Sequence, residues 1–188
     1  MMNRDEAIRL WRTYNQDESL FRHALSVEAA MRHFAALYKE DPEYWGLVGL
    51  LHDVDYEKWP KEHLKHSREI LSTAGFPEEF IRAVESHGWG LCSDVEPKSR
   101  MEKVLFAVDE LTGFIAACAY VRPSKSVLDM EVKSVKKKWG SAAFAAGVNR
   151  SVIEKGAEML GIPLEELIRE TILALREAAE AVGLKGSA

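Results

Sequence analysis

The sequence predicts an all-α protein. Three observations support this: apolar residues recur at helical spacing, strand-like alternation is absent over any long stretch, and proline and glycine stand where helices would begin and end. A first helix is expected over residues 5–14 and a second over 18–38. The second has its apolar residues on one face, namely Leu20, Val27, Ala30, Phe34 and Leu37.

The third expected helix is the most deeply buried one. Asp41 and Pro42 form a cap and first-turn pair at its start. The segment EYWGLVGLLHD that follows them is apolar almost all round, as in a helix that other helices surround.

Proline and glycine delimit the later elements. Further helices are expected over residues 62–73, 77–86 and 100–120, and three or four more after residue 126. Pro60 precedes the first of these helices, and Gly75 ends it.

The composition is that of an average globular domain. The 188 residues are 47% hydrophobic and 29% charged, and the net charge of −5 speaks against a nucleic-acid polymer as partner. The N-terminus lacks the apolar core of a signal peptide, and the longest apolar stretch, residues 104–121, contains Asp109 and Glu110, so no membrane association is expected. Two cysteines without a CxxC motif fit reduced thiols, and a cytoplasmic location is expected.

An adjacent histidine and aspartate, His52 and Asp53, end the predicted buried helix. A buried carboxylate is costly unless it is paired or bound to a metal. Imidazole nitrogen and carboxylate oxygen are ligands for zinc, iron, manganese and similar ions. Alone the pair is weak support for a metal site, because such dipeptides arise by chance.

Other ionisable residues lie on apolar helix faces, namely His23, His66, His87 and Asp109. Each alone is more simply a satisfied core group. Together they favour a shared cation, because one ion would compensate all of them at once. His63, one turn before His66, is expected at the surface, with an exchange of roles between the two left open.

Three segments in order, HALSVEAAM, LLHDVDYEKWP and FAVDELTGF, resemble those that define the HD superfamily of metal-dependent phosphohydrolases. The resemblance covers residues 20–120 and implies a core of about five helices. It implies four metal ligands, namely His23, His52, Asp53 and Asp109. It also implies that Asp53 is the bridge if two metals are bound, and that His66 and His87 are the extra histidines of dinuclear members. Many members read HDIGK where this chain reads HDVDYEK, which leaves the substrate open.

The resemblance further implies one HD-type domain over residues 1–188, with an HD core at about 18–121 and a helical extension at about 122–184. One or two divalent ions per chain are expected, from among Mn, Fe, Mg, Zn, Ni and Co. They would activate water to hydrolyse phosphate esters or anhydrides of a small molecule, with a nucleotide as one candidate. The candidate catalytic residues are Asp53, Lys58 and Glu110, and the candidate phosphate-holding residues are Lys58, Arg122 and Lys125. Asp55 is a further candidate for supporting the ligands or carrying a proton.

Two other functions stay open. A mixed-valent di-iron oxygenase of the HD fold would use the same set of histidines and aspartates. A non-catalytic signalling module of HD type is the third alternative, although such modules typically have lost ligands. Residues 166–184 carry an apolar stripe that is expected to pack on the core, and a homodimer through it is compatible with each enzyme function.

Overall fold

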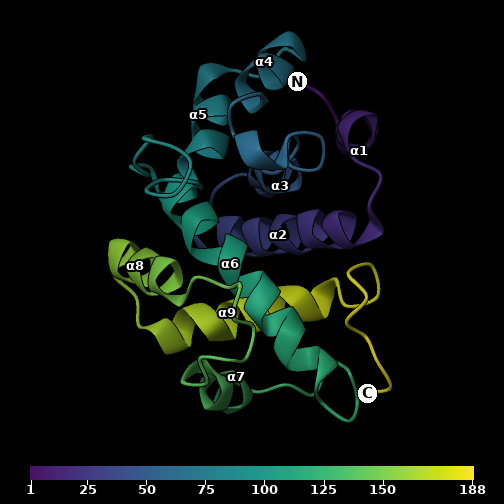
Figure 1. Cartoon of the computed structure of the whole chain (residues 1–188), viewed down its shortest axis with the longest axis vertical. Helices are drawn as coiled ribbons and strands as arrows, with labels where there is room; N and C mark the ends of the chain where they lie inside the picture. Colours follow the sequence, from purple (N-terminus) through teal and green to yellow (C-terminus); the bar gives the residue numbers. More distant parts are fainter.

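A computed structural model describes all residues, Met1–Ala188, and its regular structure is helical (Figure 1). The helices are α1 (Arg4–Tyr14), α2 (Glu18–Leu37), α3 (Pro42–Leu51), α4 (Ser67–Thr73), α5 (Glu78–Ser86), α6 (Arg100–Tyr120), α7 (Val132–Trp139), α8 (Arg150–Leu160) and α9 (Leu164–Glu177). There is no strand, so the all-α prediction is confirmed.

The pair α2 and α3 forms the centre of the N-terminal half. Helix α3 begins as expected, because the Asp41 side chain accepts a hydrogen bond from the Glu43 N–H and Pro42 occupies the first turn. Gly49 allows close approach to α2, since a Cβ there would lie 2.8 Å from the Val27 carbonyl oxygen. This contact places the C-terminal end of α3 beside the middle of α2.

Helix α6 joins the two halves of the molecule. In Figure 1, α1 to α5 lie above it and α7 to α9 below. Its start is a capping box, in which the Ser99 hydroxyl accepts from the Glu102 N–H and the Glu102 carboxylate from the Ser99 N–H. Helix α8 packs tightly on α6, because a Cβ on Gly156 would lie 2.6 Å from the Ala107 Cα.

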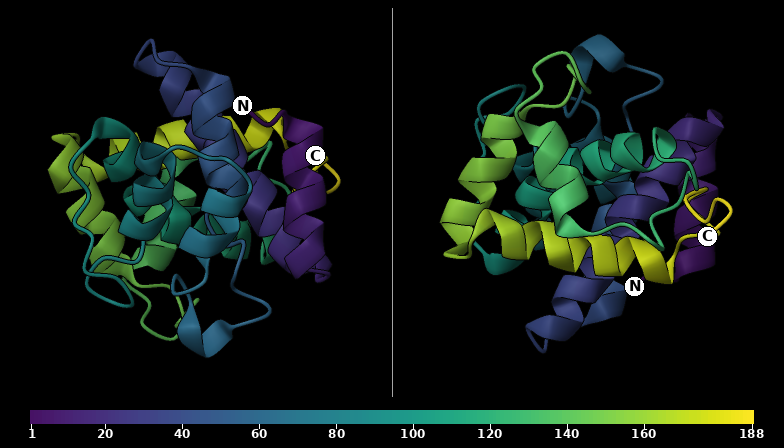
Figure 2. Two further views of the ribbon diagram at one scale, coloured as in Figure 1. Left: turned by 90° about the horizontal axis from the view of Figure 1, so that it is seen from above. Right: turned by 90° about the horizontal axis from the view of Figure 1, so that it is seen from below.

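Helix α9 closes the C-terminal half. It packs on both α2 and α6 and runs across one side of the molecule (Figure 2). One hydrophobic cluster extends from Ala7 to Leu184, so the C-terminal helices share a core with residues 18–121. None of the helices combines the length and the apolar character that crossing a membrane requires.

The structure departs from the predicted helices mainly between residues 60 and 66. A helix was expected over 62–73, but α4 begins only at Ser67. A short 3-10 turn, Pro60–Glu62, precedes an irregular stretch in which Leu64 has a φ of 68°. A bulky residue in the left-handed region cannot continue a right-handed helix, and the directions of the side chains before Ser67 change accordingly.

Candidate metal centre

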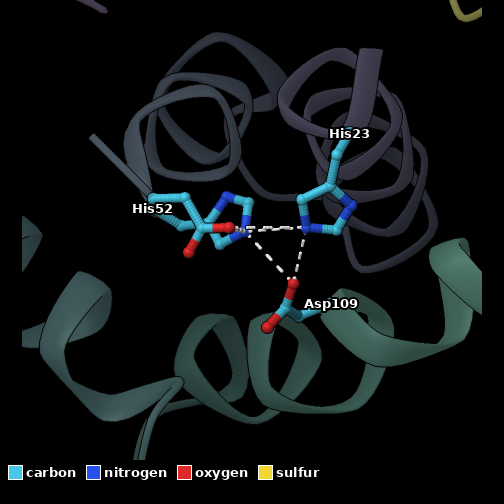
Figure 3. Close-up of side chains that lie close together, drawn as sticks. His23, His52 and Asp109 are labelled. Carbon is cyan, nitrogen blue, oxygen red and sulfur yellow. Dashed lines mark hydrogen bonds and ion pairs between the residues drawn. The ribbon is translucent and has the colours of Figure 1, made fainter. Parts of the chain in front are cut away.

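Three helices bring four predicted residues together. His52 and Asp53 follow the last residue of α3. Figure 3 shows His52 meeting His23 from α2 and Asp109 from α6. The Asp109 Oδ1 lies 2.9 Å from the His23 Nε2 and 3.1 Å from the His52 Nε2. The Asp53 Oδ2 lies 3.2 Å from the His52 Nε2. One ligand atom from each residue falls within 4.8 Å of those of the other three, so these residues could hold a metal ion.

A second group of donors shares Asp53 with the first. The Asp53 Oδ1 lies 3.1 Å from the His63 Nε2 and 3.2 Å from the His87 Nε2. These two nitrogen atoms are 3.1 Å apart. Asp53 therefore turns one oxygen to each group, and the two groups form one continuous cluster.

The backbone and a buried carboxylate orient the imidazoles. The Nδ1 atoms of His52 and His87 lie 2.6 Å from the carbonyl oxygens of Gly49 and Val84. Because a carbonyl oxygen only accepts, each Nδ1 carries a hydrogen and each Nε2 faces the cluster, where the neutral ring would offer its lone pair to a metal. The His63 Nδ1 similarly lies 2.8 Å from an oxygen of Asp55.

Asp55 is fully buried and connects the cluster to the start of α4. Its second carboxylate oxygen accepts hydrogen bonds of 3.2 Å from the N–H groups of His66 and Ser67. The His63 ring and the N–H groups of His66 and Ser67 all donate hydrogen bonds to Asp55, and a carboxylate can accept all three. Asp55 thus positions His63 without belonging to either donor group.

Strong electrostatic coupling holds the cluster together. Burial opposes ionisation of Asp109, but the neighbouring His52 and His23 outweigh it and lower the Asp109 pKa. Burial likewise opposes protonation of His63, and hydrogen bonds to Asp53 and Asp55 still raise its pKa to about 9. A metal cation that enters the cluster would displace the protons that balance the charge of these carboxylates, because imidazole binds metal only in its neutral form.

The donors fit a divalent metal ion. Imidazole nitrogen and carboxylate oxygen are the ligands that first-row transition metals share. His52 is fully buried, whereas the side chains of Asp53, Asp109 and His23 are 18%, 20% and 27% exposed, so the cluster opens to solvent on the side of these three residues. The His23 and His52 Nε2 atoms face each other at 3.3 Å, an arrangement that a shared cation stabilises.

A cavity of about 320 Å³ lies over the open side of the cluster. Its lining includes both donor groups except His52, and also Glu110 from α6 and two valines from the start of α8 and the turn before it. The Glu110 carboxylate accepts a hydrogen bond of 3.2 Å from the Asn149 N–H. Burial and the nearby Asp109 raise the Glu110 pKa.

His66 does not join the cluster, in contrast to its expected place there. Its ring stacks on Trp59 at a centroid distance of 4.1 Å, and its Nε2 lies 3.4 Å from Glu62. His63, expected at the surface, supplies the imidazole instead. The physical reason is the irregular chain before Ser67, which turns residue 63 inward and residue 66 outward.

The three predicted phosphate-holding cations also lie away from the cluster. Lys58 is exposed, with its Nζ 4.7 Å above the Trp59 ring. Arg122 donates to the Ser134 hydroxyl, and Lys125 donates to the Tyr120 carbonyl. Both follow the C-terminal end of α6, and at 1.5 Å per residue that end lies about 16 Å along the helix axis from Asp109. The placement of these residues removes them from contact with a group bound at the cluster.

The valines of the cavity wall, Val148 and Val152, were missed by sequence reasoning. Apolar residues near a helix start look like ordinary core residues, and nothing in their spacing connects them with the histidines. Only the packing of α8 on α6 reveals their place.

A model of the HD domain family matches residues 20–113, half of the chain. The matched stretch contains all six residues of the two donor groups. No curated protein and no solved structure matched the chain significantly. The family match and the ordered His, His-Asp and Asp residues in one cluster agree, and the chain belongs to the HD domain family.

Proposed function

We propose that this protein is a metal-dependent phosphohydrolase that acts on a small phosphorylated molecule. The observation that carries the proposal is the pair of donor groups joined by Asp53 at the floor of an open cavity. Membership of the HD domain family, which is typical of metal-dependent hydrolases, supports it.

Asp53 belongs to both donor groups. His23, His52, Asp53 and Asp109 would hold one ion, and Asp53, His63 and His87 would hold a second. When bound, such ions lower the pKa of a coordinated water and neutralise phosphoryl oxygens. The partly exposed side of the cluster, at His23, Asp53 and Asp109, leaves room for a water and a phosphoryl group.

The protein's own contribution is mainly orientation. The carbonyls of Gly49 and Val84 fix two imidazoles, and Asp55 fixes a third, so the donors keep their directions before substrate enters. Glu110 is the only carboxylate of the cavity lining outside the donor groups. We assign it the task of handling a proton at the leaving oxygen, because its hydrogen bond to Asn149 holds it in the cavity wall.

The decisive experiment combines metal analysis with a substrate screen. Protein reconstituted with Mn, Fe, Zn, Mg, Co or Ni is assayed for phosphate release from phosphoesters and nucleotides. Asp53→Ala is expected to abolish tight metal binding and turnover while the helical circular dichroism spectrum is retained. His66→Ala is the matched control, because that ring lies outside the cluster, and it should keep both. Turnover that survived in Asp53→Ala would refute the assignment.

A second candidate function is a mixed-valent di-iron oxygenase. The four imidazoles and two carboxylates around one cluster favour it as a specific alternative. Iron in the purified protein together with oxygen-dependent turnover would support this function. Phosphate release by the manganese-loaded protein without oxygen would support hydrolysis. Failure to bind any metal after reconstitution would instead support a non-catalytic signalling module.

A further inference from the structure

The cavity over the donor groups has an unusual distribution of charge. Its fourteen lining residues include no lysine and no arginine. Outside the donor groups, Glu110 is the only charged residue among them. Any part of a substrate that extends beyond the cations therefore meets either a carboxylate or uncharged side chains.

This distribution disfavours a chain of phosphates. Each further phosphate brings negative charge and oxygens that proteins satisfy with arginine, lysine or backbone N–H groups. Here a second or third phosphate would lie near Glu110, and the Asn149 N–H already donates to that carboxylate. The cavity therefore suits a substrate with one phosphoryl group, which cations at the donors would hold.

The remaining wall is apolar. Leu20 from α2, Val148 and Val152 line the same cavity as the donors. At its mouth Leu91 is 65% exposed and Tyr56 is 39% exposed, which makes them two of only seven large apolar side chains at the surface. Apolar side chains gathered at the rim of a cleft mark a place where a ligand covers them.

Gly113 leaves free space beside this wall. It lies one helical turn after Asp109 on α6, and a Cβ added there would meet no atom within 4 Å. Gly113 lines the same cavity as the start of α8, and the tight contact between Gly156 and Ala107 fixes the position of that helix. The open space is therefore part of a built site, rather than a loose surface.

From these observations we infer that the substrate is a phosphate monoester whose organic group is uncharged and largely apolar, lying against Val148, Val152 and Gly113. The inference rests on the proposed function and adds the class of substrate. A water oxygen forms the new bond to phosphorus, the ester P–O bond breaks, and the leaving oxygen takes a proton, giving an alcohol and inorganic phosphate. The volume of about 320 Å³ is at the small end of ligand cavities, which fits a compact organic group.

Non-hydrolysable phosphonates test the inference by binding alone. Methylphosphonate and n-hexylphosphonate are titrated calorimetrically into the manganese-loaded protein. Each methylene buried against the apolar wall should tighten binding about fourfold. Burial of only two of the methylenes that the hexyl compound adds should therefore make it bind about sixteenfold more tightly than the methyl compound. Equal affinities of the two compounds would overturn the apolar site and leave the phosphoryl site intact.

Two variants locate the site. Val152→Thr keeps the shape of the side chain but places a hydroxyl on the wall, and Gly113→Val fills the free space. Both should lower the affinity for hexylphosphonate several-fold and leave that for methylphosphonate unchanged. Val132→Thr, at the start of α7 and outside the cavity, is the matched control and should change neither. Equal losses in the control, or none in either variant, would overturn the assignment of this wall.

Turnover gives an independent comparison. Hexyl phosphate is expected to release phosphate faster than ribose 5-phosphate or a nucleoside triphosphate under the same metal loading. A clear preference for the triphosphate or the sugar phosphate would refute the inferred substrate class, while still supporting phosphohydrolysis. If no phosphonate binds and no phosphoester is cleaved, the proposed function fails first and the inference with it.

Discussion

The contact between α6 and α8 can be measured with one pair of glycine substitutions. Gly156→Ala would place a Cβ 2.5 Å from the Ala107 Cβ and 2.6 Å from its Cα. Carbon atoms normally approach to about 3.5–4.0 Å, so the new atom is about 1 Å too close. Neither alanine side chain can rotate away, and the two helices must separate. Overpacking of this kind costs roughly 1–3 kcal/mol.

Gly113→Ala supplies the matched control. Both glycines lie inside helices, and both substitutions gain about 1 kcal/mol of helix propensity. Because Gly113 has no atom within 4 Å of the added Cβ, it gains this propensity without a clash. The difference between the two variants therefore isolates the contact and should be about 1–3 kcal/mol.

Urea and thermal unfolding followed by circular dichroism measure this difference. A domain of this length shifts its Tm by about 2–4 °C per kcal/mol, so Gly156→Ala should melt roughly 2–12 °C below Gly113→Ala. Equal Tm values in the two variants would refute the tight packing of α8 on α6. They would also remove the support that this packing gives to the apolar cavity wall.

Three further predictions concern the cluster and a helix start. A divalent metal at a hundred times its Kd should stabilise the protein by about 2.7 kcal/mol, or roughly 5–11 °C in Tm. His66→Ala should retain this shift in Tm, and His63→Ala should lose much of it. The opposite order would contradict the ligand set. Asp55→Asn should weaken metal binding by about 10–100-fold, because the amide N–H₂ of the new side chain would face backbone or imidazole donors in either orientation. Competition with a chelator measures the affinity. A value within about twofold of wild type would count against the role of Asp55. Hydrogen bonds from the Ser19 hydroxyl and the backbone N–H groups of Leu20 and Ser19 lower the Asp17 pKa from its ordinary 3.8, so its stabilisation is complete above that value and is lost as the pH falls below it. The urea midpoint of Asp17→Asn should therefore fall less than that of wild type between pH 6 and pH 3, and parallel curves would disprove the link.

The helical fold and most of the donor residues could be predicted from local pattern. The apolar stripe of residues 18–38 and the all-round apolar segment before His52 define α2 and α3 almost to the residue. The long apolar segment around Asp109 defines α6 over residues 100–120. Periodicity succeeds here because these helices are long and their buried faces are continuous.

The choice between His63 and His66 could not be made in this way. Helical periodicity places His66 one turn before the buried Ile70, but that reasoning applies only if residue 66 lies inside the helix. The left-handed Leu64 and the 3-10 turn at Pro60 end regular spacing before Ser67. Which histidine turns inward is decided by the buried Asp55, whose partners lie 8 to 12 residues further along the chain.

Long-range packing decided the other misplacements. Lys58 seemed close to the donors in sequence, yet the chain after Asp53 turns and its ammonium group lies over Tyr14 and Trp59. Val148 and Val152 seemed distant, yet α8 returns to the cavity through its contact with α6. Sequence distance is a poor guide wherever a turn or a helix crossing intervenes.

The rings of His52 and His87 would keep their directions when no metal is bound, because each is hydrogen-bonded to the carbonyl three residues before it. Each ring is tethered within its own terminal helical turn, so its direction is encoded by four consecutive residues and not by the ion. A metal that dissociates would leave these two rings aimed as before. Reloading would then require little rearrangement of the chain, and exchange between competing ions would be governed by their supply and ligand preference more than by refolding of the protein.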